Sequence, residues 1–222
     1  MSNSWLVAIF PVGGITMAML INWFSDALPQ SRWHTKISLW QSQAGALAIE
    51  RHLLTTIICL AASIIIPLRF GVSLHSLVLL LWGGFFLLIA VIDFEHRLVL
   101  NKVLLVGIAI ALCATILRIP LAPSFKHSLL GAGVGFALFA LIALLGRGAM
   151  GAGDVKLAGT IGLVIGYPNV LAALLAGVII GGIAALYVML KYRDRRATIP
   201  YAPWLAAGAM LVLLQNAAQL PT

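Results

Sequence analysis

The sequence carries little charge for its length. Only 9% of its 222 residues are Asp, Glu, Lys or Arg, whereas 62% are hydrophobic. A water-soluble domain cannot bury that much apolar surface, but a lipid bilayer accepts it. The scarcity of charge therefore excludes an ordinary soluble enzyme and predicts a protein that crosses a membrane several times.

Cysteine is equally scarce. Cys59 and Cys113 each lie inside an apolar run, and no CxxC pair is present. This pattern gives no zinc site and no disulfide framework, so no metal is expected. We expect both thiols to be small buried apolar side chains. The first residues, MSNSWLVAIF, lack a basic region and a small-residue cleavage site, so they predict a retained first helix.

Apolar runs set the expected fold, because about 20 apolar residues in a helix cross a hydrocarbon core of about 30 Å. The runs predict helices at about 5–24, 53–70, 75–93, 99–118, 128–146, 155–167, 168–190 and 201–217. We predict an all-α, polytopic membrane bundle of about eight (six to eight) transmembrane helices. Residues 1–222 are expected to form one integral membrane domain, in which the polar stretch 25–52 is a cytoplasmic membrane-surface segment.

Positive charges predict the orientation of these helices. Of the 14 Lys and Arg residues, Arg69, Arg118 and Lys126 fall on one side, which leaves 14 − 3 = 11 on the other. The positive-inside rule places the larger group in the cytoplasm and both termini outside. Anionic lipid and this insertion bias are sufficient reasons for the net charge of +8, so a nucleic-acid partner is not expected.

Acidic residues are rarer, and their placement is informative. Two of the six, Asp93 in VIDFEHRLVL and Asp154 in GAMGAGDVKL, fall at predicted helix boundaries on the cytoplasmic side. Carboxylates at the edge of the apolar slab are costly and usually face a bundle interior or a wet cavity. The alternative is that each caps a helix or pairs with Arg97 or Lys156. All six lie on the cytoplasmic side: Asp26, Glu50, Asp93, Glu95, Asp154 and Asp194.

Two carboxylates at the same depth suggest a reaction. Gly151 and Gly153 precede Asp154, and glycine allows the backbone to approach a neighbouring helix closely. If Asp93 and Asp154 meet there, the pKa of one is raised and the pair shares a proton. The ionised partner then activates water while the protonated one polarises a carbonyl, without metal or cofactor. Helix caps and the proton relay of a transporter remain alternatives.

A family resemblance follows from the same stretches. GAGDVKL resembles the GxGD signature of membrane aspartyl peptidases, and its Lys-Leu ending resembles type IV prepilin leader peptidases. Asn101, eight residues after Asp93, and the aspartate separation of 154 − 93 = 61 residues also fit that family. Weaker matches lie at both ends of the chain, at Asn22, Leu28, Pro29, Pro200, Pro203 and Gly208.

The resemblance implies roles for individual residues. Asp93 and Asp154 would be catalytic, and Gly151, Gly153, Lys156 and Asn101 would support the loop or the substrate. Glu95 is a candidate contact for a basic substrate, its alternative being a helix-end pair with Arg97.

The implied reaction removes the basic leader from type IV prepilins or type II secretion pseudopilins after a glycine. It would take place at the cytoplasmic face of the bacterial inner membrane, with these pilins and the lipid bilayer as partners. No cofactor is expected for proteolysis, and S-adenosylmethionine would be needed only if a methyltransferase activity were retained.

Some features depart from the family pattern. Many members carry a tetracysteine motif between the first two helices, but residues 25–52 contain no cysteine, and Leu100 replaces the usual proline before Asn101. The family's N-terminal Gly-Ser is also replaced, around Gly13, Gly14 and Thr16, and this segment is the one linked with methylation, so N-methylation of the product is not part of the main prediction.

Two other function classes stay open, a small proton-coupled transporter and a non-catalytic pilus or secretion assembly subunit. Acids at one membrane edge and the lack of pseudo-symmetric halves favour the peptidase. No oligomeric state is predicted.

Overall fold

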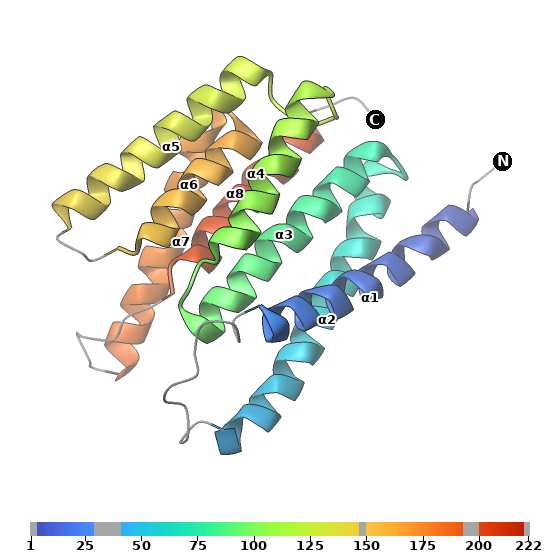
Figure 1. The fold of residues 1–222 in the computed structure, drawn as a ribbon. Coiled ribbons are helices and arrows are strands. Elements are labelled where there is room, and N and C mark those ends of the chain that lie inside the picture. Colours follow the sequence, from blue (N-terminus) through green and yellow to red (C-terminus); the bar gives the residue numbers. More distant parts are fainter. Residues whose placement is uncertain (1–3, 29–40, 147–149, 193–199, 220–222) are drawn as a thin grey trace. The chain divides into compact units, whose positions relative to one another are not determined.

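All regular elements in the part that the structure describes are α-helices, joined by short connections (Figure 1). The structure is a computed structural model that describes residues 4–28, 41–146, 150–192 and 200–219. The helices in these ranges are α1 (Ser4–Ala27), α2 (Gln41–Phe70), α3 (Leu74–His96), α4 (Asn101–Ile116), α5 (Phe125–Leu145), α6 (Ala152–Ile165), α7 (Asn169–Tyr192) and α8 (Ala202–Ala218). Each of the predicted helices is therefore confirmed.

Helix α2 differs most from its predicted range. It begins at Gln41, whereas the apolar run begins at 53. Residues 41–52 are mostly polar or small, but Gln, Ala, Leu, Glu and Arg are good helix formers, so they extend the helix. The predicted surface segment 25–52 thus ends α1, extends α2 and otherwise falls in 29–40, outside the described residues. Its location at the membrane surface stays a prediction.

The polytopic membrane class is confirmed by helix length and composition. Among the described residues, four helices are long and apolar enough to cross a bilayer: Glu50–Phe70, Leu74–His96, Phe125–Leu145 and Asn169–Lys191. Asn101–Ile116 and Ala202–Ala218 are shorter apolar helices. The number of further crossings and the orientation stay predictions, and several of the basic residues behind that orientation lie outside the described ranges: Arg32, Lys36, Arg147, Arg193, Arg195 and Arg196.

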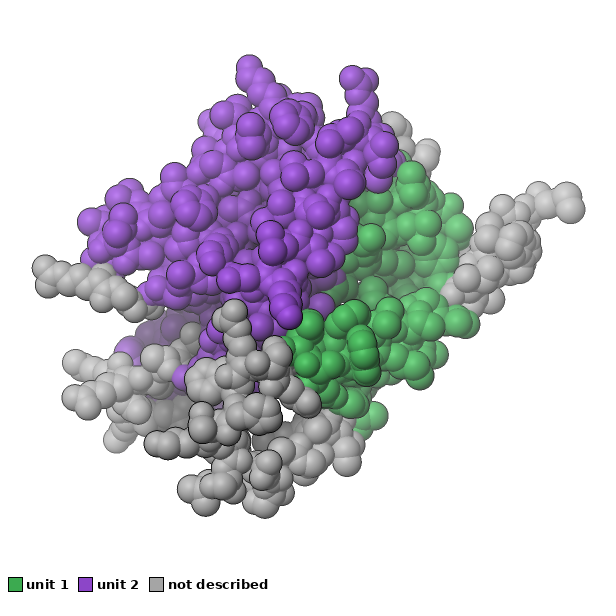
Figure 2. Space-filling view, in the orientation of Figure 1, with its two compact units in different colours: residues 1–84, 222 green, residues 85–221 purple. Residues whose placement is uncertain are grey.

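The chain divides into two compact units, coloured separately in Figure 2, which comprise residues 1–84 with 222 and residues 85–221. The expectation of a single domain stays a prediction. In the first unit α1 packs against α2, and Gly14 lies where any side chain would overlap Ser63. Cys59, on the same face of α2, is fully buried as predicted.

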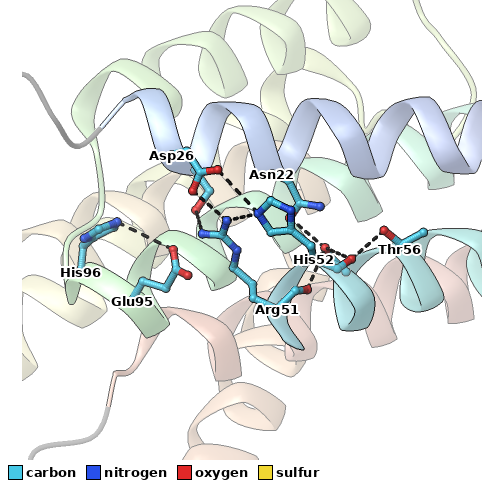
Figure 3. A network of polar contacts seen from close by, with 9 residues as sticks. Asn22, Asp26, Arg51, His52, Thr56, Glu95 and His96 are labelled. Atoms are coloured by element: carbon cyan, nitrogen blue, oxygen red, sulfur yellow. Dashed lines mark hydrogen bonds and ion pairs between the residues drawn. The ribbon is translucent and has the colours of Figure 1, made fainter. Parts of the chain in front are cut away.

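Polar side chains also join α1 to α2 (Figure 3). The Thr55 hydroxyl donates to Oδ1 of buried Asn22 at 2.8 Å. Nearer the helix ends, Nη2 of Arg51 donates to Oδ1 of Asp26 at 2.7 Å, and the His52 ring lies 3.6 Å from the other oxygen of Asp26. These residues form a polar seam, Asn22, Asp26, Arg51, His52 and Thr55, between the two helices.

The second unit is arranged around α6, which packs against α4, α5, α7 and α8. Leu157, Ala158 and Ile161 on α6 are completely buried. Figure 1 shows α5 running alongside α6, and their approach depends on glycine. A Cβ on Gly162 would overlap the carbonyl of Gly131, so the two backbones are in direct contact. Helix α6 therefore has closely fitting neighbours that fix its position within the unit.

Cys113 corrects one prediction. It was expected to be buried, but it lies on an exposed side of α4. An apolar helix in a membrane protein has lipid-facing and core-facing sides of similar composition, so hydropathy alone does not separate them. The prediction was wrong for this thiol.

Candidate active site

Asp93 lies in the last turn of α3 and is buried, with 5% of its surface exposed. The helix ends because Arg97 adopts a left-handed backbone conformation (φ 49°) while its N–H still bonds to the Asp93 carbonyl at 2.9 Å. The N–H of Ala202, the first residue of α8, donates to Oδ2 of Asp93 at 3.0 Å. A backbone donor from a helix N-terminus stabilises negative charge on this carboxylate.

Asp154 lies in the first turn of α6, where the N-terminal end of the helix favours an acidic side chain. It is half-buried. Burial and, secondarily, the negative charge of Asp93 raise the pKa of Asp154 to about 6, against the opposing effect of a hydrogen bond from the Gly151 backbone. The structure therefore brings the two predicted aspartates within electrostatic reach of each other, and Asp154 holds a proton more readily than an ordinary aspartate.

The beginning of α8 is linked to both aspartates, by a hydrogen bond to Asp93 and by the electrostatic effect of Asp154 on Tyr201. The N–H of Ala202 donates to Asp93. Burial and, secondarily, the negative charge of Asp154 raise the pKa of the preceding residue, Tyr201. These contacts were not predicted from the sequence. The available signal was Pro203, because proline in the first turn marks a helix start whose N–H groups lack partners within the helix.

The predicted supporting residues lie on both sides of Asp154. Nζ of Lys156 donates to Oδ1 of Asn101 at 3.0 Å, which links α6 to the first residue of α4. A Cβ on Gly153 would come within 2.8 Å of the Val99 Cβ, so this glycine is required for close approach. Gly151 has an ordinary backbone conformation, and an added Cβ there would make only normal contacts.

Glu95 and His96 follow Asp93 at the end of α3. Nε2 of His96 lies 3.8 Å from Oε2 of Glu95, so this acid contacts its neighbouring histidine (Figure 3). Phe94, more than half exposed, meets the Trp204 ring edge-on, with 6.2 Å between ring centroids. That ring contact is a second link between the end of α3 and the beginning of α8.

The chemistry available at this site is acid–base chemistry of two carboxylates. Among the described residues, no three His, Cys, Asp or Glu side chains come together as a metal site would require. A carboxylate with a backbone donor beside one with a raised pKa can take a proton at one oxygen and deliver one at another.

Comparison with known proteins bears on the same residues. The sequence profile described as "Type IV leader peptidase family" matches residues 78–186, which include both Asp93 and Asp154. This part of the chain belongs to the type IV leader peptidase family. The family resemblance seen in the sequence is thereby confirmed.

Curated relatives agree with this assignment. A "Prepilin leader peptidase/N-methyltransferase" of Bacillus subtilis (strain 168) is 34% identical over 148 residues, which cover 66% of this chain and 59% of the relative. A protein with that name from Xanthomonas campestris is 29% identical over 168 residues, covering 72% of this chain and 56% of its own. Another from Pseudomonas putida is 27% identical over 174 residues (74% and 58%). The chain thus spans 56–59% of the length of these relatives. No solved structure matches it.

Proposed function

We propose that this chain is a membrane-embedded aspartyl endopeptidase that removes the basic leader from type IV prepilins or type II secretion pseudopilins. The observation that carries the proposal is that Asp93 and Asp154 lie within electrostatic reach of each other, with the Ala202 N–H bonded to the first and a pKa of about 6 on the second. The family assignment of residues 78–186 and the names of the relatives support the substrate class.

The proposed mechanism gives each aspartate a separate task. Ionised Asp93, stabilised by the Ala202 N–H, takes a proton from water as the water oxygen attacks the scissile carbonyl carbon. Asp154 donates its proton to the carbonyl oxygen, which gives a neutral gem-diol. When the C–N bond breaks, Asp93 passes its proton to the leaving nitrogen and Asp154 regains one from a gem-diol hydroxyl. Both residues return to their starting states.

The charges of the leader and of the loops bear on the proposed substrate and on the side of the membrane that the site faces. A leader with positive charge beside the scissile bond suits a site near acidic side chains, and Glu95 is the proposed secondary contact for it. The site would face the cytoplasm at the bacterial inner membrane, because the basic loops lie on that side under the positive-inside rule. Methylation of the new N-terminus is a separate reaction that would require S-adenosylmethionine, and the aspartate geometry does not bear on it.

The test uses purified protein in detergent with a prepilin that carries its leader. Asp93→Asn and Asp154→Asn are each expected to reduce cleavage roughly 10²- to 10⁴-fold, the usual contribution of a positioned acid or base. Asp26→Asn, an acid of the polar seam in the other unit, is the matched control and should cleave as wild type does. Mass spectrometry of the product would show both the cleavage position and any added methyl group.

Undiminished cleavage by either dyad variant would refute the assignment of the aspartates. If folded wild type does not cleave, the transporter and assembly-subunit alternatives gain support. Proton flux into proteoliposomes would then separate those two, because only the transporter predicts a flux that Asp154→Asn abolishes.

A further inference from the structure

Two contacts join the beginning of α6 to the short segment that connects α3 with α4. The first is the hydrogen bond from Nζ of Lys156 to Oδ1 of Asn101, at 3.0 Å. The second is the close packing of Gly153 against Val99, where an added Cβ would lie 2.8 Å from the valine Cβ. Asp154 lies between Gly153 and Lys156 in the sequence, so contacts flank it on both sides.

The connecting segment is also the continuation of the helix that carries Asp93. Helix α3 ends at His96, and α4 begins at Asn101, eight residues after Asp93. The Lys156–Asn101 bond therefore closes a short path through the chain between the two aspartates. The Gly153 contact with Val99 is a second link between this segment and the first turn of α6.

Such a link is needed because the aspartates repel each other when both are ionised. Like charges at a shared site favour separation, unless the surrounding structure holds them together. Lys156 does not neutralise Asp154, because residues two positions apart on a helix point about 200° away from each other. Its hydrogen bond goes to a neutral amide on another helix, which fixes position without cancelling charge.

We propose that Lys156 and Asn101 form a clamp that holds Asp154 beside Asp93, so that both are positioning residues. Both side chains are exposed, so the bond contributes little to global stability. The proposal rests on the proposed peptidase function only for its consequence in catalysis. The placement of Asp154 can be measured without any substrate.

Other charged groups must be considered before the pH response is assigned to the clamp. Asp93 is the charge that acts on Asp154, and Lys156 lies on the same helix as Asp154. Helix α3 and its end also carry Glu95, His96 and Arg97. The described elements that pack against α6 contribute Lys102 on α4, Lys126 and His127 on α5, Tyr187 and Lys191 on α7, and Tyr201 at the beginning of α8.

The test is the pH dependence of carbodiimide labelling at Asp154, because a carbodiimide reacts with the protonated carboxyl. Dicyclohexylcarbodiimide would be applied to the purified protein in detergent, and labelling at Asp154 would be followed by mass spectrometry. In wild type, half-maximal labelling is expected near pH 6. Asn101→Leu removes the clamp without changing charge. The body of α6 stays held by its neighbours, but its first turn is freed to carry Asp154 away from Asp93, so the pKa of Asp154 falls. A fall of about one unit would reduce labelling at pH 6 roughly fivefold.

Matched variants separate the clamp from a general loss of charge. Lys156→Met breaks the same bond, and the loss of a positive charge alone would shift the labelling midpoint upward, not downward. Lys156→Arg keeps a donor and should keep the wild-type midpoint. Lys102→Met removes a neighbouring exposed lysine and should also leave it unchanged. An unchanged midpoint in both Asn101→Leu and Lys156→Met would overturn the proposal.

Enzyme kinetics give a second readout. Displacement of Asp154 should lower kcat of Asn101→Leu at least tenfold with little change in KM, because chemistry is affected and substrate binding is not. A rise in KM at constant kcat would instead make Asn101 a substrate contact and overturn the clamp. If wild type shows no cleavage, the proposed function fails while the labelling midpoints still decide the clamp.

Discussion

Helices α1 and α2 in the first unit, and α5 and α6 in the second, are two packed pairs held together by different groups. Between α1 and α2, buried Asn22 and Thr55 share a hydrogen bond, and Arg51 reaches Asp26. Between α5 and α6, the backbones approach each other closely at Gly131 and Gly162. Each pair also has the other kind of contact, since Gly14 lies against Ser63 on α2 and buried Ser128 on α5 donates to the Leu163 carbonyl on α6. What distinguishes the second pair is that a glycine faces a glycine at the crossing.

The difference matters because α6 carries Asp154. A backbone contact leaves no rotamer to adjust, so α6 is held at a fixed distance from α5. A polar seam can lose one hydrogen bond and keep the others. We therefore expect substitutions to damage the glycine crossing abruptly and the polar seam by degrees.

The largest effect is expected from Gly162→Ala. Its Cβ would overlap the Gly131 carbonyl, and backbone cannot move aside as a side chain can, so the free energy of unfolding should fall by about 3 kcal/mol. Unfolding by denaturant in detergent measures this. Gly133→Ala on α5, where nothing lies within 4 Å, is the control and should be neutral or stabilising. Equal losses in both variants would contradict the account of the crossing.

Thr55→Val should have an intermediate effect. It removes the hydroxyl that donates to buried Asn22, and an orphaned buried acceptor costs about 1–2 kcal/mol. Thr56→Val is the control, because Thr56 is exposed to a greater degree and bonds within its own helix to the His52 carbonyl at 2.6 Å. In a double-mutant cycle with Asn22→Leu, a coupling energy of zero would show that the seam is not a stabilising pair.

The pH response distinguishes the two pairs further. The pKa of Asp154 is raised to about 6, so the folded state binds this proton more tightly than the unfolded chain, where an aspartate titrates near 3.9. This contribution to stability is present below about pH 4 and is lost as pH rises through about 6. Thermal unfolding of wild type should show that loss, and Asp154→Asn should not. If Asp154→Asn kept the pH dependence of wild type, the titration of Asp154 would not be the cause of that dependence.

The smallest effect is expected from Asp26→Asn at the exposed end of the polar seam. The Asp26 side chain is 50% exposed, so its bond to Arg51 is worth roughly 0.2–1 kcal/mol and should weaken as salt is added. Unfolding at low and high ionic strength checks this. If the free energy of unfolding fell more than in Thr55→Val, the ion pair would stabilise the polar seam more than the buried Thr55–Asn22 hydrogen bond does.

The sequence predicted helices well because lipid-facing and core-facing sides are both apolar, which makes each span a continuous run. The same uniformity concealed which side is which, as Cys113 shows. The first turns of α2 were missed for a different reason, because their Gln and Ser residues do not belong to an apolar run. Composition is thus sufficient to predict where the helices lie in the sequence. Which side of each helix faces the protein core depends on packing, which composition does not reveal.

For the candidate site, Asp93 and Asp154 could be selected from the sequence because carboxylates are rare and costly in such an apolar chain. Lys156 and Asn101 were both selected from the sequence as supporting residues, but the hydrogen bond between them was not predicted. The donor at Ala202 was not visible, because every residue except proline has a backbone N–H, and only the fold decides which one meets a carboxylate.

The position of the Ala202 N–H in the sequence has a consequence for biosynthesis. Ala202 lies 109 residues after Asp93, so a chain growing from its N-terminus contains Asp93 long before its hydrogen-bond partner has been made. Until α8 is synthesised and packed, the carboxylate lacks the group that stabilises its charge. A half-made chain would therefore carry both aspartates without the Ala202 N–H, and the proposed peptidase site would be complete only after α8 has been synthesised and packed.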